Sequence, residues 1–118
     1  MPNEMLVKFL ALCTEDDALK AFAKNRKMSS FFRITDSGDQ FYIAFDAGTV
    51  TGDVGAPATS PDLVLSMSSQ TLQGLMTGKV HGETAVMNGQ LYVSDEWRAM
   101  DMQAILHDLA RLFQQASS

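Results

Sequence analysis

The segment FFRITDSGDQFYIAFD, residues 31–46, decides the fold class of this chain. Apolar and polar residues alternate on both sides of residues 36–39, a polar quartet with a glycine that is typical of a turn. Side chains in a strand point alternately to opposite faces, so a period of two indicates one apolar face. The segment therefore predicts a β-hairpin.

Shorter strands are expected on the C-terminal side of this hairpin. A weak strand is expected at residues 49–51, before a loop rich in Gly, Pro, Ser and Thr at residues 52–61. Residues 62–67 alternate again, and residues 91–93 form a last short strand.

Helices are expected before, between and after the strands. Residues 3–27 predict two helices, the second starting at Thr14, where Asp17 three residues later approximates a capping box. A helix capped by Ser68 or Ser69 should end at Gly78, and residues 83–87 allow a turn or two. The clearest element is one final helix over residues 97–115, with apolar residues at helical spacing. Strands joined by hairpins and covered by helices predict an α+β fold with an antiparallel sheet.

Composition and length predict a single globular unit. The chain has 118 residues, of which 46% are hydrophobic and 19% charged, enough apolar surface for a core. We expect one domain over residues 1–118, with an N-terminal helical segment at residues 1–27 and a sheet-and-helix core at residues 31–115.

Net charge and cysteine content indicate which classes of partner and which cellular compartment to expect. The formal net charge of −5 disfavours nucleic acid and anionic membranes. Residues 1–4 lack the positive region of a signal peptide, and the apolar run at residues 5–13 is too short to span a bilayer. We therefore expect no stable membrane insertion, with transient membrane contact left open. The single Cys13 fits a reducing compartment, and a cytoplasmic location is expected. The oligomeric state is left open.

The sequence contains no constellation typical of a catalytic or metal site. His81 and His107 are 26 positions apart with no further ligand at suitable spacing. Cys13 beside one of these histidines would make a nucleophile pair, but a buried helical cysteine fits its apolar setting better. We expect no enzyme, no cofactor and no metal.

Methionine is abundant in the second half of the chain. Of eight methionines, five fall within 36 positions: Met67, Met76, Met87, Met100 and Met102. Methionine side chains adapt to irregular shapes, so these residues either line a pocket for a flexible lipid or fill a small core.

Several motifs resemble the sterol carrier protein type 2 family. The most specific is Leu72-Gln73-Gly74-Leu75-Met76-Thr77-Gly78-Lys79-Val80, a helix ending in Leu-x-x-Gly-Lys-hydrophobic. The short segment 85–89, the strand 91–93 and the Ala-Met-Asp-Met-Gln sequence at residues 99–103 follow in the family's order. Upstream, residues 43–46 and 61–66 also fit. Gln90 and Asp101 stand where the family usually has lysine.

The resemblance implies a curved antiparallel sheet of about five strands, covered on one face by helices and enclosing an apolar tunnel. It implies non-catalytic binding, and transfer, of a hydrophobic ligand: a fatty acid, a fatty acyl-CoA, a phospholipid or a sterol-like molecule. The residues then expected to line the tunnel are Phe32 and Ile34, Phe41 or Ile43, Leu63 or Leu65, Leu72, Leu75, Met76, Val86, Met87, Met100, Met102, Ile105, Leu106 and Leu109.

Two alternatives from other functional classes stay open. One is an accessory module with the same fold and a filled core that serves an enzyme of lipid or quinone metabolism. The other is a small cone-shaped α+β enzyme that uses Asp46, Asp53 or Tyr42 inside its pocket, since such an enzyme needs a carboxylate with a raised pKa.

Overall fold

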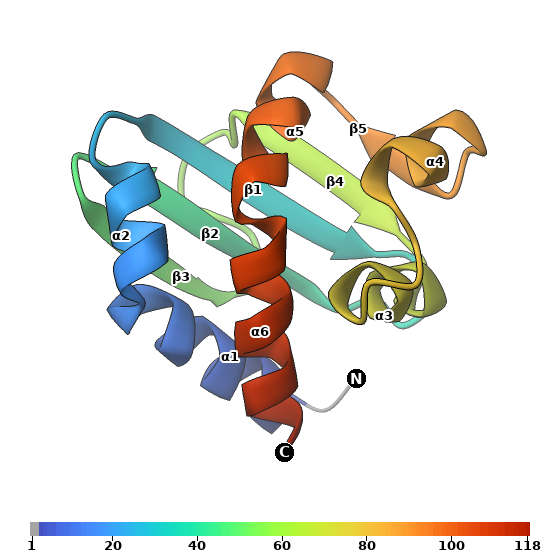
Figure 1. Ribbon diagram of the computed structural model, residues 1–118, viewed down its shortest axis with the longest axis horizontal. Helices are drawn as coiled ribbons and strands as arrows, with labels where there is room; N and C mark the ends of the chain where they lie inside the picture. The colour runs from blue at the N-terminus through green and yellow to red at the C-terminus, as the bar shows by residue number, and fades with distance from the viewer. Residues whose placement is uncertain (1–2) are drawn as a thin grey trace.

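The computed structural model describes residues 3–118; residues 1 and 2 of the expected domain and of the expected N-terminal segment lie outside the described residues. Helices and a sheet form two layers (Figure 1). The elements in chain order are α1 (Asn3–Glu15), α2 (Asp17–Ala23), β1 (Lys27–Ile34), β2 (Gln40–Asp46), β3 (Thr49–Val54), β4 (Leu63–Met67), α3 (Ser69–Met76), α4 (Gly82–Met87), β5 (Leu91–Val93), α5 (Glu96–Met102), the 3-10 turn η1 (Gln103–Ile105) and α6 (Leu106–Ser117).

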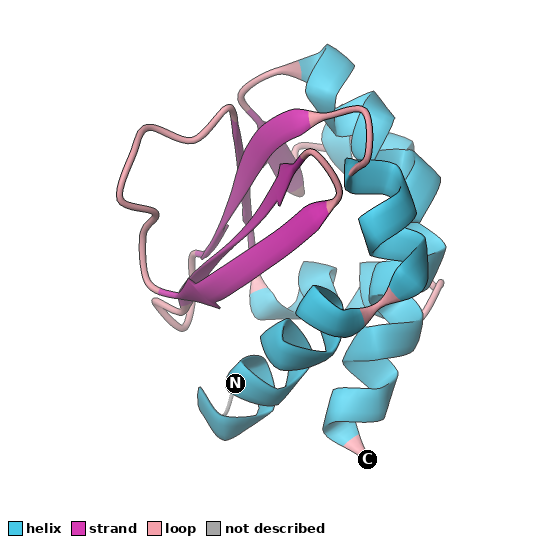
Figure 2. Ribbon diagram, turned by 90° about the vertical axis from the view of Figure 1, so that its left-hand side faces the viewer, coloured by secondary structure: helices cyan, strands magenta, loops and turns pink. Residues whose placement is uncertain are grey.

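The five strands form one open sheet in the order β3-β2-β1-β4-β5. The α+β class is confirmed, and so is the coverage of one sheet face by helices (Figure 2). The expectation of a fully antiparallel sheet is wrong at one place, because β1 and β4 pair in parallel. Short hairpins keep β1, β2 and β3 antiparallel, whereas the loop after β3 returns the chain to the far side of β1. A parallel pair requires such a long crossover connection.

The strands bury the faces that the sequence alternation predicts. Phe32 and Ile34 are buried, as are Phe41, Ile43 and Phe45, and the residues between them are more exposed. Phe32 lies opposite Phe41 on β2 and opposite Leu65 on β4. Because the side-chain period is two, this register keeps the apolar side chains together beneath the helices.

Some element boundaries differ from the expected ones. β1 begins at Lys27 rather than at residue 31, because residues 27–30 also pair with β2. Thr14 does not start a helix: it remains in α1, where its hydroxyl donates to the carbonyl of Ala11. Asp16 caps α2 instead, since its carboxylate accepts from the backbone N–H of Leu19.

The expected final helix is broken into three pieces. α5 ends at Met102, η1 follows, and α6 begins at Leu106 after Ile105 departs from helical geometry (φ −112°, ψ 6°). α6 packs against α1 and α3, whereas α5 lies nearer β5 (Figure 1). Apolar spacing continues through the break, so the sequence pattern does not reveal it.

Within residues 3–118, no helix is both long and apolar enough to cross a bilayer.

Candidate ligand pocket

A pocket of about 380 Å³ lies between one end of the sheet and the helices that cover it. Strands β1, β4 and β5 form its floor, and α3, α4, α5, η1 and α6 form its walls. The lining includes eleven of the residues expected from the sequence: Phe32, Leu65, Leu72, Leu75, Met76, Val86, Met87, Met100, Met102, Leu106 and Leu109.

All five clustered methionines line this one pocket. Met67 belongs to the floor, Met76 to α3, Met87 to α4, and Met100 and Met102 to α5. Their unbranched side chains have three rotatable bonds and a polarizable sulfur, so the wall can adjust to occupants of different shape.

Five residues expected to line the tunnel lie elsewhere. Ile34, Phe41, Ile43, Leu63 and Ile105 are buried in the core but do not line the pocket. Phe41 and Ile43 belong to β2, at the end of the sheet where the N-terminal helices pack. Alternation places all of these strand residues on the inner face, but the hollow occupies only part of that face.

Eight lining residues are not among those that the family resemblance led us to expect along the tunnel, although Met67 belongs to the methionine cluster. The apolar ones are Met67, Leu91, Val93 and Ala99, and the others are Gly82, Glu83, Glu96 and Gln103. The sequence pattern could have identified Met67, which lies two positions after Leu65 and so faces the same side of the strand. It could also have identified Leu91 and Val93, which alternate with Tyr92 in the last strand. The polar residues carried no such signal, because a glutamate at the start of a helix is ordinary.

The pocket opens to solvent between α4 and α5. Met87 is 86% exposed and Met100 is 57% exposed, although both line the pocket, and Glu83 and Glu96 are exposed beside them. Large exposed methionines at the edge of an apolar hollow mark its mouth.

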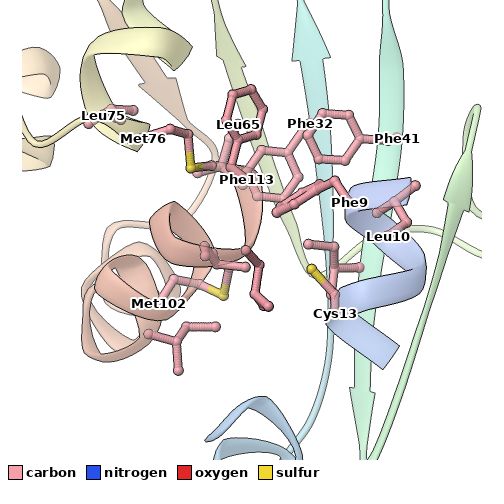
Figure 3. Packing of buried hydrophobic residues seen from close by; sticks show 14 of the residues in the cluster. Phe9, Leu10, Cys13, Phe32, Phe41, Leu65, Leu75, Met76, Met102 and Phe113 are labelled. Atoms are coloured by element: carbon pink, nitrogen blue, oxygen red, sulfur yellow. The ribbon is translucent and has the colours of Figure 1, made fainter. Parts of the chain in front are cut away.

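Close packing of aromatic rings bounds the pocket at its inner end. Phe32 stacks on Phe41 with ring centroids 4.7 Å apart, and Phe9 meets Phe41 edge-on at 6.1 Å. Phe113 of α6 contacts Phe9 in the same edge-on manner at 5.5 Å (Figure 3). Phe32 is the boundary residue, because it belongs to this ring cluster and also lines the pocket.

The turn between α3 and α4 brings α4 to the pocket. Ser68 caps α3 by accepting from the N–H of Thr71, and the Gly74 carbonyl accepts from the N–H groups of Lys79 and Val80. Gly78 provides the left-handed conformation (φ +76°) that reverses the chain. A Cβ on Gly74 would collide with a methyl carbon of Val80, so this packing requires glycine.

A bidentate ion pair holds α5 to the start of β1. The Arg26 guanidinium donates to both Asp101 carboxylate oxygens at 2.7 Å and to the Phe22 carbonyl at 2.8 Å, and it lies 3.9 Å above the Phe22 ring centre. Hydrogen bonding from Arg26 holds the pKa of Asp101 below its ordinary value; partial burial opposes this shift, and the positive charge of Arg26 adds to it. Asp101 thus positions α5, one wall of the pocket.

A more polar groove of about 1060 Å³ lies on the other side of α4 and η1. It shares Leu75, Met76, Gly82, Glu83, Gln103 and Leu106 with the pocket, so these residues separate the two hollows. Both histidines, His81 and His107, line the groove and not the pocket.

The candidate catalytic groups are not gathered in the pocket. Cys13 is buried in α1, and burial, followed by the charge of Asp16, raises its pKa to about 12, which leaves a thiol rather than a reactive thiolate. Tyr42 and Asp53 pair across β2 and β3 on the opposite sheet face, and Asp46 is exposed. Among residues 3–118, no group of three or more His, Cys, Asp and Glu side chains could hold a metal ion.

One protein family and several solved structures are similar to this chain. The SCP-2 sterol transfer family matches residues 7–107. No curated protein matches the sequence.

The solved structures with a similar fold include the following three. A crystal structure of sterol carrier protein 2 is 15% identical, with 95% of each chain covered and a TM-score of 0.71. The UbiJ-SCP2 ubiquinone synthesis protein is 18% identical, with 94% of this chain and 96% of that one covered and a TM-score of 0.62. The sec-alkylsulfatase Pisa1 from Pseudomonas sp. is 17% identical, with 90% of this chain covered and a TM-score of 0.68. The present chain spans only 16% of that sulfatase.

Proposed function

This chain belongs to the SCP-2 sterol transfer family, and from that membership we propose that it binds one hydrophobic ligand in the pocket between α3, α4, α5 and the sheet, without catalysing a reaction on it. The observation that carries the proposal is the meeting of five methionines from four elements in one hollow of about 380 Å³. This volume lies within the range of roughly 300–1,000 Å³ for small-molecule sites.

Burial of an acyl chain supplies enough free energy without a charged anchor. Each buried methylene contributes about 0.8 kcal/mol, so a sixteen-carbon chain gains about 12 kcal/mol against an association cost of about 4–15 kcal/mol. Micromolar affinity requires about −8 kcal/mol. Recognition therefore depends on shape and length, and we expect low selectivity among tails.

The ligand classes proposed are a fatty acid, a fatty acyl-CoA, a phospholipid and a sterol-like molecule. A pocket near the small end of the usual range, with an adaptable wall, favours a single flexible chain. Transfer would need the mouth between α4 and α5 to meet a donor or acceptor. η1, which interrupts the final helix, is the place where α5 would move.

Binding of an uncharged, environment-sensitive probe such as Nile red tests the proposal. The fluorescence of the probe should rise saturably with a stoichiometry near one to one. Val86→Trp fills the pocket from α4 and should abolish the signal, whereas Val7→Trp on the exposed side of α1 is the matched control and should not. A folded protein without saturable binding would contradict the proposal.

We also propose that residues 1–118 act as one binding unit and that the protein is located in the cytoplasm. The packing of the N-terminal helices supports the single unit, since α1 packs on β3 and α6, and α2 packs on β2 and β3. Limited proteolysis should then give no stable fragment lacking residues 3–23.

An accessory role is the second candidate. Exposed Met87, Trp97 and Met100 on α4 and α5 supply an apolar surface of the kind that binds partner proteins. The fold also occurs in a ubiquinone synthesis protein and within a sulfatase chain. Native mass spectrometry of protein from its own host separates the two roles, because a binding domain should retain a lipid as added mass.

A further inference from the structure

The mouth of the pocket carries negative charge and no positive charge. Glu83 and Glu96 line the pocket, and no described lysine, arginine or histidine does. Both glutamates are exposed, and neither forms an ion pair with a described residue. The polar end of a ligand whose tail lies among the methionines would therefore face two carboxylates.

Three nearby arginines are each paired with another carboxylate. Arg98 lies 3.6 Å from the Asp95 carboxylate, and Arg26 is occupied by Asp101. Arg111, which lines the adjoining groove together with Glu83, is paired with Asp16 and Asp108. Asp95 also accepts from the N–H groups of Trp97 and Arg98 at the start of α5. α4 has only six residues, so its dipole offsets little.

We infer that the ligand is an amphiphile whose polar end is uncharged or positively charged, such as a long-chain alcohol or a long-chain quaternary amine, rather than a free fatty acid or an acyl-CoA. This inference rests on the proposed function and narrows its ligand class. At about 6 Å through water, each carboxylate weakens binding of an anionic head about threefold, and the two together about tenfold.

Three ligands with the same sixteen-carbon chain test the inference: hexadecanol, hexadecyltrimethylammonium and palmitate, each kept below its micellar concentration. Their displacement of Nile red is measured at low ionic strength and at about 1 M salt, where the Debye length is about 3 Å. Hexadecanol should compete about tenfold more strongly than palmitate at low salt, and the quaternary amine, which the same two carboxylates attract, about a hundredfold more strongly. The difference should shrink at high salt, because exposed charges are screened.

Two double variants locate the effect. Glu83→Gln with Glu96→Gln should bring the affinities for palmitate and hexadecanol together. Glu4→Gln with Glu15→Gln removes the same charge from α1, away from the pocket, and should leave the palmitate penalty in place.

The outcomes separate the inference from the proposed function. Equal competition by palmitate and hexadecanol in the unmodified protein would overturn the inference while binding stands. Loss of the penalty in the Glu4 and Glu15 control would also overturn it, since net charge rather than the mouth would then be responsible. Failure of hexadecanol and Nile red alike to bind would overturn the proposed function itself.

Discussion

The layer between sheet and helices is packed with rigid rings at one end and with flexible chains at the other. At the aromatic end, made by Phe9, Phe22, Phe41, Phe45 and Phe113, the rings contact one another or Phe32 at centroid distances of 4.7–6.1 Å. At the methionine end, made by Met67, Met76, Met87, Met100 and Met102, the side chains surround a pocket. In Figure 3, Met76 and Met102 of the methionine end lie on one side of the view, and Phe9 and Phe41 of the aromatic end lie on the other.

The difference shows how one fold combines stability with room for a ligand. Aromatic rings have few rotamers and interlock in offset and edge-on geometries, so their end of the core closes. Methionine rearranges at low cost, so its end tolerates a hollow. We therefore expect substitutions at the aromatic end to change stability, and substitutions at the methionine end to change binding.

The sharpest test of this division compares Phe9→Ala with Met76→Ala. Phe9 is fully buried against two rings, and its truncation should lower the free energy of unfolding by about 3–5 kcal/mol. Met76 already borders the pocket, so its loss should cost about 2 kcal/mol. Urea unfolding with unchanged m-values measures both. Equal losses would show that the two ends are packed alike.

Gly74→Ala tests the turn that places α4 over the pocket. The new methyl group would collide with the β-branched Val80, and after the gain in helix propensity we expect a net loss of about 1–2 kcal/mol. Val80→Ala in the same chain should recover part of it. Gly82→Ala is the matched control, because its Cβ would meet the flexible Gln103 amide, and it should cost less. Thermal unfolding ranks the three variants, and a Gly82→Ala loss as large as that of Gly74→Ala would contradict this account.

Asp101→Asn tests the ion pair that joins the two ends. Both partners are about one-third exposed, so solvent screening limits the loss to about 1 kcal/mol at neutral pH. Because the pKa of Asp101 is lowered in the folded protein, its contribution is fully present above the ordinary aspartate value near 3.9 and is lost as pH falls through the folded value.

The stability deficit of the Asn variant should accordingly shrink below about pH 4. Asp108→Asn, which removes an exposed pair with Arg111, should cost less than Asp101→Asn at neutral pH. Chemical unfolding between neutral and acid pH measures both variants. A deficit for Asp101→Asn that persists in acid would rule out the ion pair as its cause.

Met100→Ala should have the smallest effect on stability and still weaken binding. Its side chain is mostly exposed, so the free energy of unfolding should change by less than about 0.5 kcal/mol. Lost contact at the mouth should raise the Nile red dissociation constant about threefold. Val7→Ala, which removes an exposed side chain from α1, should change neither quantity. Unchanged binding in Met100→Ala would remove the mouth from the proposed site.

Some features of the site could be predicted from the sequence and others could not. The methionine cluster and the helix ending at Gly78 were evident, because composition and capping are local properties. The strand residues were harder: Leu63 and Leu65 share a face, yet only Leu65 lines the pocket. Whether a buried strand residue lines the pocket depends on which helix lies above it.

Local sequence patterns predict where the strands and most helices lie and which strand faces are buried, and the motifs point to the family. The parallel pairing of β1 with β4, the break at residues 103–105, and the placement of Glu83 and Glu96 at one mouth depend on how the elements pack together. These two kinds of feature differ in the sequence distance over which they are determined. Hydrophobic periodicity and capping act over a few residues, whereas a hollow exists only where side chains distant in sequence fail to fill the space between them.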